Sequence, residues 1–543
     1  MKNITVKHCF LALVVVFAAA SCSKNLDLLP VNSLTPVTTY STVAGYKSVL
    51  AKIYGTLSIT GNTGPAGTPD IGGGLDEGSQ VAFIRMFFNC EELPTDEAVV
   101  AWNDQTIHDF HNLVWTADDP FLKGIYARPI YNITLINEYL RESTDQKLGS
   151  RSITGSDAAD IRKSRAEARY LRAFNYWVMM ELFGKSTFIT ESNLIGTDLP
   201  GEISRTDLFW YITNELKAID GSLAPVKSIE YGRVDQGAEW ALMARMYLNA
   251  NVYLGTSNTS FNDTAITYAQ KVINAGYQLN TAAVNGYSGY SQLFLADNDQ
   301  RTNEIVWAIN CDGLNTQAYG NTTFFVHCAS GADHDQYGVS GGWNGYRATQ
   351  GFANLFPDLT GATDKRAMFV TTSYGVSPAQ ITINDVSNFD QGLHVNKYRN
   401  IRSDNGPIHD PTKTYSDVDF PVFRLAEMYL IYAEAVLRGG AGGTTTQALT
   451  YINLIRSRAG ASLFTSSDLT LQNILNERGR ELYWEGHRRT DLIRYGLLTT
   501  GTYLWPWKGG VSSGTSVDGK YNIFPIPQTN RTSNPNLSQN AGY

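Results

Sequence analysis

Two short acidic motifs have the spacing that could hold a metal ion. They are DND at 297–299 and DVD at 417–419. In an extended segment, residues two apart project to the same side. Each motif can therefore direct two carboxylates at a hard cation such as calcium, which takes about six to eight oxygen ligands. The alternative interpretation is an ordinary Asx turn together with the approach to a helix before Pro421.

A third acidic segment, EELPTDEA at 91–98, could carry hydrolytic chemistry. Paired carboxylates cleave glycosidic bonds when they are held about 5 to 10 Å apart. The same segment is also typical of a turn at Pro94 followed by the start of a helix, where acidic side chains interact favourably with the helix dipole. We favour the second interpretation and predict that the protein is not an enzyme.

Histidine and cysteine give only weak patterns. HDFH at 108–111 and HCASGADH at 327–334 could hold a transition metal, but an exposed helix face and a polar loop are the simpler interpretations. No CxxC pair or cluster with zinc spacing occurs. Beyond the first 22 residues the cysteines are Cys90, Cys311 and Cys328, of which the last two could form one disulfide in an oxidising compartment.

Residues 1–21 are typical of a secretory signal peptide. Two lysines precede an apolar run, and small residues stand before Cys22. A cysteine directly after the cleavage point is typical of a bacterial lipoprotein, whose acyl chains would hold the mature chain, 22–543, on a membrane surface without a spanning helix. The alternative is a soluble secreted protein with an incidental cysteine.

The composition favours a ligand-binding protein. Two of the 43 basic residues lie in the leader, so 41 basic and 51 acidic residues remain, and no segment is strongly basic. This charge distribution excludes a typical nucleic-acid-binding protein. The chain contains 30 Tyr, 23 Phe and 10 Trp, and aromatic rings on loops commonly hold flat-faced ligands.

The hydrophobic periodicity predicts a mainly α protein without a linker that would divide it. Two segment pairs, 236–255 with 261–277 and 425–440 with 446–460, have alanines at crossing positions, as tetratricopeptide-like helical pairs do. This scaffold is expected over about 40–280 and 420–500. The clearest predicted helices are 45–58, 122–142, 159–183, 206–221, 236–254 and 263–276.

Residues 280–420 are rich in Gly, Asn, Asp and aromatic residues. Short strand-like pieces occur at 304–309 and 322–327. A long loop-rich region inside a helical protein is usually functional. We therefore expect the ligand-binding surface in this region.

Several long segments occur in a fixed order along the chain: NLDLLP after Cys22, then 166–185, 420–437, 477–496 and 524–543. Together they resemble the SusD/RagB family, outer-membrane lipoproteins of Bacteroidetes. The resemblance implies a single domain over 22–543, anchored at the cell surface, that passes nutrients to a SusC-like TonB-dependent transporter.

Segments 88–102, 293–299, 312–320, 402–427 and 503–510 resemble the starch-binding members of this family. The resemblance implies a non-catalytic protein that captures starch or maltooligosaccharides, with another glycan or a peptide as the alternative cargo. It implies glycan contacts at Arg85, Trp102, Tyr319 and Trp343. It also implies a polar residue after Trp102 that contacts the glycan. The segment here is one residue shorter than the family pattern, so the candidates for that position are Asn103, Asp104 and Gln105. It also implies a calcium site at the two acidic motifs, with Asp299, Asp417 and Asp419 preferred over Asp297.

Overall fold

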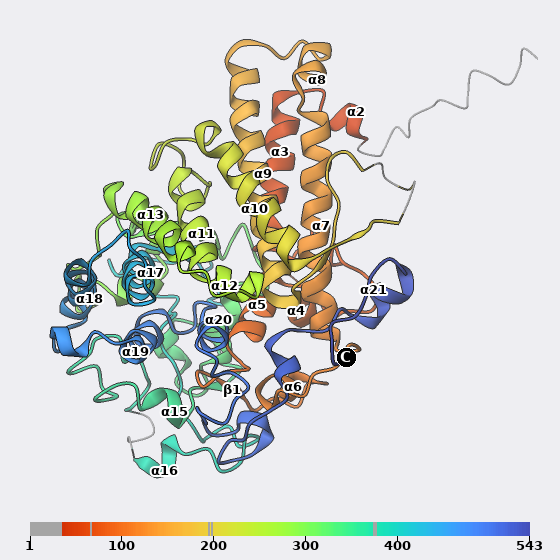
Figure 1. Ribbon diagram of the computed structural model, residues 1–543. Helices are drawn as coiled ribbons and strands as arrows, with labels where there is room; N and C mark the ends of the chain where they lie inside the picture. The colour runs from red at the N-terminus through yellow and green to blue at the C-terminus, as the bar shows by residue number, and fades with distance from the viewer. Residues whose placement is uncertain (1–34, 66–67, 194–195, 197–198, 373–376) are drawn as a thin grey trace, which may run out of the picture.

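The computed structural model describes residues 35–543 except 66–67, 194–195, 197–198 and 373–376 (Figure 1). The predicted signal peptide and the predicted lipidation site, Cys22, lie outside these residues. None of the described helices combines the length and apolar character needed to cross a bilayer.

The N-terminal half forms a column of long helices at the top of Figure 1. Helices α3 (Val43–Gly55), α7 (Pro120–Glu142) and α9 (Gly155–Phe183) pack on one another, and α10 (Arg205–Ile219) packs on α9. The Asp119 carboxylate caps α7 by accepting from the N–H groups of Phe121 and Leu122, which satisfies donors that a helix start leaves free. The predicted helices in this half are confirmed.

The two predicted helical pairs stack on each other although about 150 residues separate them in sequence. Helix α13 (Ser260–Asn274) packs on α11 (Gln236–Leu248) and on α17 (Leu425–Leu437), which in turn packs on α18 (Thr445–Ala459). Alanines at the crossings are fully buried, so the helices approach closely. The tetratricopeptide-like scaffold is therefore confirmed.

Short elements complete the structure. The remaining helices are α2 (Pro36–Thr39), α4 (Glu77–Gln80), α5 (Phe83–Glu91), α6 (Ile107–Asn112), α8 (Asp145–Ser150), α12 (Ala250–Leu254), α14 (Thr322–Cys328), α15 (Gln350–Ala353), α16 (Pro378–Ile381), α19 (Leu471–Leu482), α20 (Arg488–Arg494) and α21 (Gln528–Ser533). Three antiparallel pairs of strands occur in the described chain: β1 (Val99–Val100) with β5 (Tyr346–Arg347), β2 (Ser186–Thr187) with β3 (Glu202–Ile203), and β4 (Ile305–Ile309) with β6 (Phe420–Arg424).

One of the two predicted strands in the loop-rich region is confirmed and the other is wrong. The segment 304–309 forms β4, whereas 322–327 forms the buried helix α14. The Asn321 side chain caps this helix by accepting from the N–H of Thr323. A short apolar run is compatible with either a buried strand or a buried helix, so periodicity alone could not distinguish them.

The disulfide that Cys311 and Cys328 could have formed is not present in the described chain. Cys90, Cys311 and Cys328 are three separate buried thiols. The Cys311 Sγ lies 3.5 Å from the Ser58 Oγ, whereas the Cys328 Sγ contacts the backbone oxygen of Phe325 at 3.7 Å. The two thiols thus have different surroundings and serve as small core groups.

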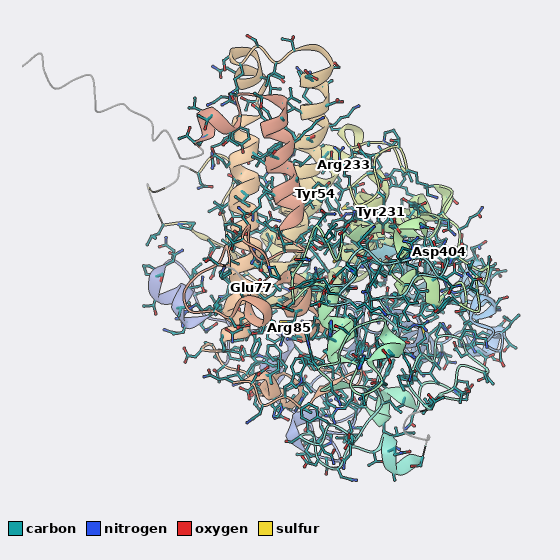
Figure 2. The ribbon with its side chains drawn as sticks, turned by 180° about the vertical axis from the view of Figure 1, so that it is seen from behind. Tyr54, Glu77, Arg85, Tyr231, Arg233 and Asp404 are labelled. Atoms are coloured by element: carbon teal, nitrogen blue, oxygen red, sulfur yellow. The ribbon has the colours of Figure 1, made fainter. Side chains whose placement is uncertain are left out.

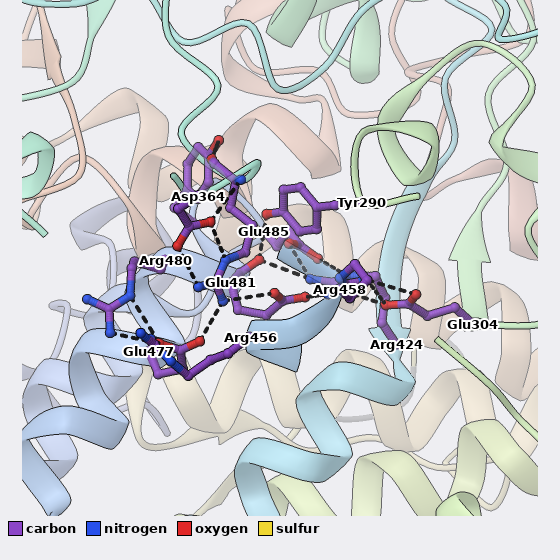
Figure 3. A network of polar contacts seen from close by, with 12 residues as sticks. Tyr290, Glu304, Asp364, Arg424, Arg456, Arg458, Glu477, Arg480, Glu481 and Glu485 are labelled. Atoms are coloured by element: carbon purple, nitrogen blue, oxygen red, sulfur yellow. Dashed lines mark hydrogen bonds and ion pairs between the residues drawn. The ribbon is translucent and has the colours of Figure 1, made fainter. Parts of the chain in front are cut away.

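A buried network of ion pairs joins the loop-rich region to the helical scaffold (Figure 3). Arg424, at the end of β6, pairs with Glu304, Glu481 and Glu485 at 2.7–3.0 Å. All of these side chains are at most 1% exposed. The network also includes Asp364, Arg366, Arg456, Arg458, Glu477 and Arg480. Loops that lack regular structure are therefore fixed by charge pairing as well as by apolar contacts.

Glu239 in α11 should make stability depend on pH. It is fully buried, and neither carboxylate oxygen has a hydrogen-bond partner among the described residues. Burial, helped by Asp220, raises the pKa of Glu239 to about 9. Because this folded pKa exceeds the unfolded one, the free energy of unfolding should fall as pH rises from about 4.5 to about 9. Glu239→Gln should therefore raise the free energy of unfolding by about 2–4 kcal/mol at pH 8 and change it little at pH 5.

Urea unfolding at pH 5 and pH 8 measures this difference. Glu138→Gln is the matched control, since Glu138 is a partly exposed residue of α7 that pairs with Arg141; its effect should stay below about 1 kcal/mol at both pH values. An equal effect of Glu239→Gln at the two pH values would contradict the expectation.

Candidate functional site

Three aromatic residues from distant parts of the chain form one cluster. The ring centroid of Trp343 lies 6.5 Å from that of Trp102 and 6.1 Å from that of Tyr319. The corresponding ring planes are inclined at 51° and 55°. All three side chains are half-buried, so each has ring surface available to a ligand. We refer to Trp102, Tyr319 and Trp343 as the aromatic platform.

The backbone of Gly345 positions Trp102. Trp102 follows β1, and the preceding residue, Ala101, donates its N–H to the Gly345 oxygen at 2.8 Å. Gly345 has a φ of 107°, and a Cβ there would lie 2.3 Å from the Trp102 Nε1. Only glycine fits both the backbone conformation and the close approach of the indole. Tyr346 also packs edge-on against the Trp102 ring, with the ring centroids 5.1 Å apart.

His327 supports Trp343 from one side. The imidazole stacks on the indole with centroids 4.7 Å apart and planes inclined by 17°. Its two nitrogens contact the carbonyl oxygens of Gly341 at 2.6 Å and Thr414 at 2.8 Å. The sequence suggested a polar loop here, but His327 is buried in α14. Its role is to hold Trp343 in place, and sequence alone carried no signal for it.

Tyr319 is paired with a ring that sequence reasoning missed. The centroid of Tyr415 lies 5.3 Å from that of Tyr319. Burial and the neighbouring Tyr319 hydroxyl raise the pKa of Tyr415 well above its usual range. Behind Tyr319, a Cβ on Gly320 would lie 2.2 Å from the Cβ of Ala82, so the loop lies directly against the start of α5. Tyr415 belongs to the segment 402–427, which resembles the starch-binding members. This resemblance was the signal in the sequence that could have identified Tyr415.

Arg85, labelled in Figure 2, lies beside the platform. Its guanidinium carbon is 5.3 Å from the centroid of Trp102 and 4.8 Å from that of Phe324. Its Nη1 donates to the Gly78 oxygen at 3.3 Å, while its Nε has no partner among the described residues. Buried donors are normally satisfied. Arg85 is 6% exposed, and its unpartnered Nε is buried.

The three candidate polar residues after Trp102 are all exposed. These residues are Asn103, Asp104 and Gln105. The segment leads into α6, and the backbone oxygen of Asp104 accepts from the N–H of Ile107. All three side chains are therefore accessible at the surface, and each stays a candidate.

The preferred carboxylates of the predicted calcium site influence one another. Asp419 is 4% exposed, and burial raises its pKa to about 8, with the charges of Asp299 and Asp417 adding to the effect. A carboxylate with this environment lacks compensating positive charge, which a divalent cation would supply. Asp297 differs, because both its oxygens accept from Ser403 and one lies 3.1 Å from Arg301. Its charge is already compensated. The two oxygens of Asp417 likewise accept the N–H groups of Gly313 and His409, so calcium binding by Asp299, Asp417 and Asp419 stays a prediction.

The segment EELPTDEA does not form the expected helix start; Glu91 ends α5, and the residues after it form turns that lead into β1. Its four carboxylates are at most 1% exposed. Asp96 accepts two bonds of 2.7 Å from Arg488, and Glu92 and Glu97 accept backbone N–H groups at 486 and 484. Buried charges need such partners, whereas glycoside hydrolysis requires carboxyl groups that reach the substrate. These residues hold the segment 477–496 in place.

Comparison with known proteins gives the family. The sequence profile of the SusD family matches residues 369–543. The chain is also 36% identical to the starch-binding protein SusD of Bacteroides thetaiotaomicron, with 100% of both chains covered. This chain belongs to the SusD family. The predicted family is thereby confirmed.

Solved structures show the SusD fold over nearly the whole chain. A SusD superfamily protein of Parabacteroides distasonis has a TM-score of 0.69 at 21% identity, with 94% of this chain and 100% of that chain covered. Surface glycan-binding protein A of Bacteroides thetaiotaomicron, solved with laminarihexaose, has a TM-score of 0.67 at 19% identity, covering 92% and 99%. Two of these three relatives carry the names of binding proteins, in agreement with the prediction that this SusD-family chain is not an enzyme.

Proposed function

We propose that this SusD-family chain captures starch or maltooligosaccharides on the aromatic platform without cleaving them. The observation that carries the proposal is the inclination of neighbouring rings by 51° and 55°. Sugar C–H faces stack on aromatic rings, so an array that turns from ring to ring suits a curved glucan better than a flat, ribbon-like one. Arg85 and the exposed polar residues after Trp102 would bind hydroxyl groups.

Titration calorimetry of the mature chain tests the cargo. Maltoheptaose and a cyclic maltooligosaccharide should bind, whereas cellohexaose, a flat β-1,4-glucan, should not. Laminarihexaose is included because a structural relative was solved with it. Binding of laminarihexaose without binding of maltoheptaose would favour the alternative of another glycan. Chromatography of maltoheptaose after incubation should show no shorter products; their formation would favour a glycosidase.

We further propose that the protein is anchored through acyl chains on Cys22 at the cell surface and delivers its glycan to a SusC-like TonB-dependent transporter. The leader pattern and the family membership support this proposal. Cys22→Ala should move the protein from the outer-membrane fraction into the soluble fraction. Retention of this variant in the membrane would contradict anchoring through Cys22. Pull-down with the full-length lipoprotein should recover the transporter, and its absence would contradict delivery to that partner.

Calcium is proposed as a structural cofactor held by Asp299, Asp417 and Asp419. Removing it with a chelator should lower the free energy of unfolding by about 2.7 kcal/mol if calcium is initially present at about 100 times its dissociation constant. Thermal unfolding with and without calcium measures the loss. Asp419→Asn should remove the response to calcium, whereas Asp404→Asn, an exposed residue paired with Arg402, should keep it. A wild-type unfolding curve that does not respond to calcium would overturn the proposal.

A further inference from the structure

A second group of metal-ligand type lies next to the platform. Asp312, His409 and Asp417 each place one ligand atom within 4.8 Å of the others. The His409 Nδ1 lies 3.4 Å from an oxygen of Asp312 and 3.3 Å from an oxygen of Asp417. Asp417 is buried and Asp312 partly buried, while His409 is 59% exposed. The imidazole therefore covers two carboxylates at the surface.

These separations differ from those of a hydrogen-bonded histidine and aspartate. In this protein His394 and Asp333 form such a pair, with their atoms 3.0 Å apart. The distances at His409 are longer to both carboxylates, although its exposed side chain could approach either one. Ligand atoms bound to zinc at about 2.0–2.1 Å in a tetrahedral arrangement lie about 3.3–3.4 Å apart. The contacts of His409 match this spacing.

The chemistry of the donors selects the class of metal. Calcium at about 2.4 Å with neighbouring ligands at right angles would give a similar spacing, but calcium takes oxygen ligands. An imidazole nitrogen with two carboxylates suits a borderline transition metal. The backbone also preorganises the group, since Asp417 accepts the N–H groups of Gly313 and His409, each at 2.7 Å.

We propose that Asp312, His409 and Asp417 bind a divalent transition metal, zinc foremost, with water at the open position. The metal would join the segment 311–319, which carries Tyr319, to the segment 400–417. The latter carries Tyr415, which packs on Tyr319, and Thr414, whose oxygen contacts the imidazole beneath Trp343. The site thus cross-links two of the loops that form the platform. It does not depend on which glycan is bound.

Zinc and cobalt titrations of the mature chain, stripped of metal with a chelator and then dialysed, test the site. Calcium is left out because Asp417 is also a ligand in the proposed calcium site, so the two metals would compete for its carboxylate. Zinc should bind with one strong site and raise the unfolding temperature. Cobalt should give the intense visible absorption of tetrahedral coordination. His409→Gln and Asp312→Asn should each weaken zinc binding at least about tenfold and abolish that absorption.

His334→Gln is the matched control, because His334 is another partly exposed histidine beside an aspartate, with 3.5 Å between the Nδ1 and an oxygen of Asp335. This variant should bind zinc like the wild type. Equal zinc affinity of His409→Gln and wild type would overturn the proposal. A weak, octahedral cobalt spectrum in the wild type would also overturn it.

Discussion

Trp343→Ala is expected to weaken α-glucan binding by about 10- to 100-fold, because the central ring of a binding surface contributes on the order of 1.4–2.7 kcal/mol. Trp343 contacts both other rings of the platform. Its removal would leave Trp102 and Tyr319 too far apart to act as one continuous surface. Calorimetric titration with maltoheptaose measures the effect, and circular dichroism checks that the fold is kept.

Trp210→Ala provides the matched control for this experiment. Trp210 lies in α10 with its side chain 39% exposed, outside the platform and its supporting loops. This variant should bind maltoheptaose like the wild type. Unchanged affinity of a folded Trp343→Ala protein would show that the platform is not the glycan site. A loss of affinity in both variants would indicate a nonspecific effect.

Arg424→Ala is expected to lower the free energy of unfolding by about 3–5 kcal/mol, since it leaves buried carboxylates without their counter-charge. Arg424 pairs with Glu304, Glu481 and Glu485, all inaccessible to solvent. Glu304 directly precedes β4, Glu481 lies in α19 and Glu485 follows α19. The loss should therefore loosen the junction between the loop-rich region and the scaffold. Denaturant unfolding at pH 7 measures the change.

Arg402→Ala is the corresponding surface control. Its contact with Asp404 is 2.6 Å long, but both side chains are partly exposed, and such pairs contribute at most about 1 kcal/mol. A similarly small effect of Arg424→Ala would contradict the view that the buried network holds the two regions together.

The positions of the helices could be predicted from the sequence with good accuracy. The segment predicted over 122–142 is α7, and the predicted pairs 236–255 with 261–277 and 425–440 with 446–460 are the stacked pairs of the scaffold. Apolar spacing and small crossing residues are local properties of a chain segment. They can be recognised without knowledge of its neighbours.

In two other segments the prediction from local sequence patterns was wrong, because distant parts of the chain bury these segments. The segment 322–327 became a helix because it lies inside the core, with Asn321 as its cap. The acidic segment 91–98 was expected to favour a helix dipole, yet Asp96 pairs with Arg488, almost 400 residues later in the chain. No pattern within either segment identifies such a partner.

The sequence by itself determined the family, the helical scaffold and the residue types available for glycan contact. Long ordered motifs and helical periodicity depend only on residues that are close together in the sequence. Only the tertiary structure decided that Trp102 and Tyr319 both lie against Trp343, that His327 and Tyr415 support this cluster, and that burial raises the pKa of Asp419. The physical reason is that stacking distance, burial and electrostatic compensation depend on which distant segments meet. Those properties arise only when the chain is folded.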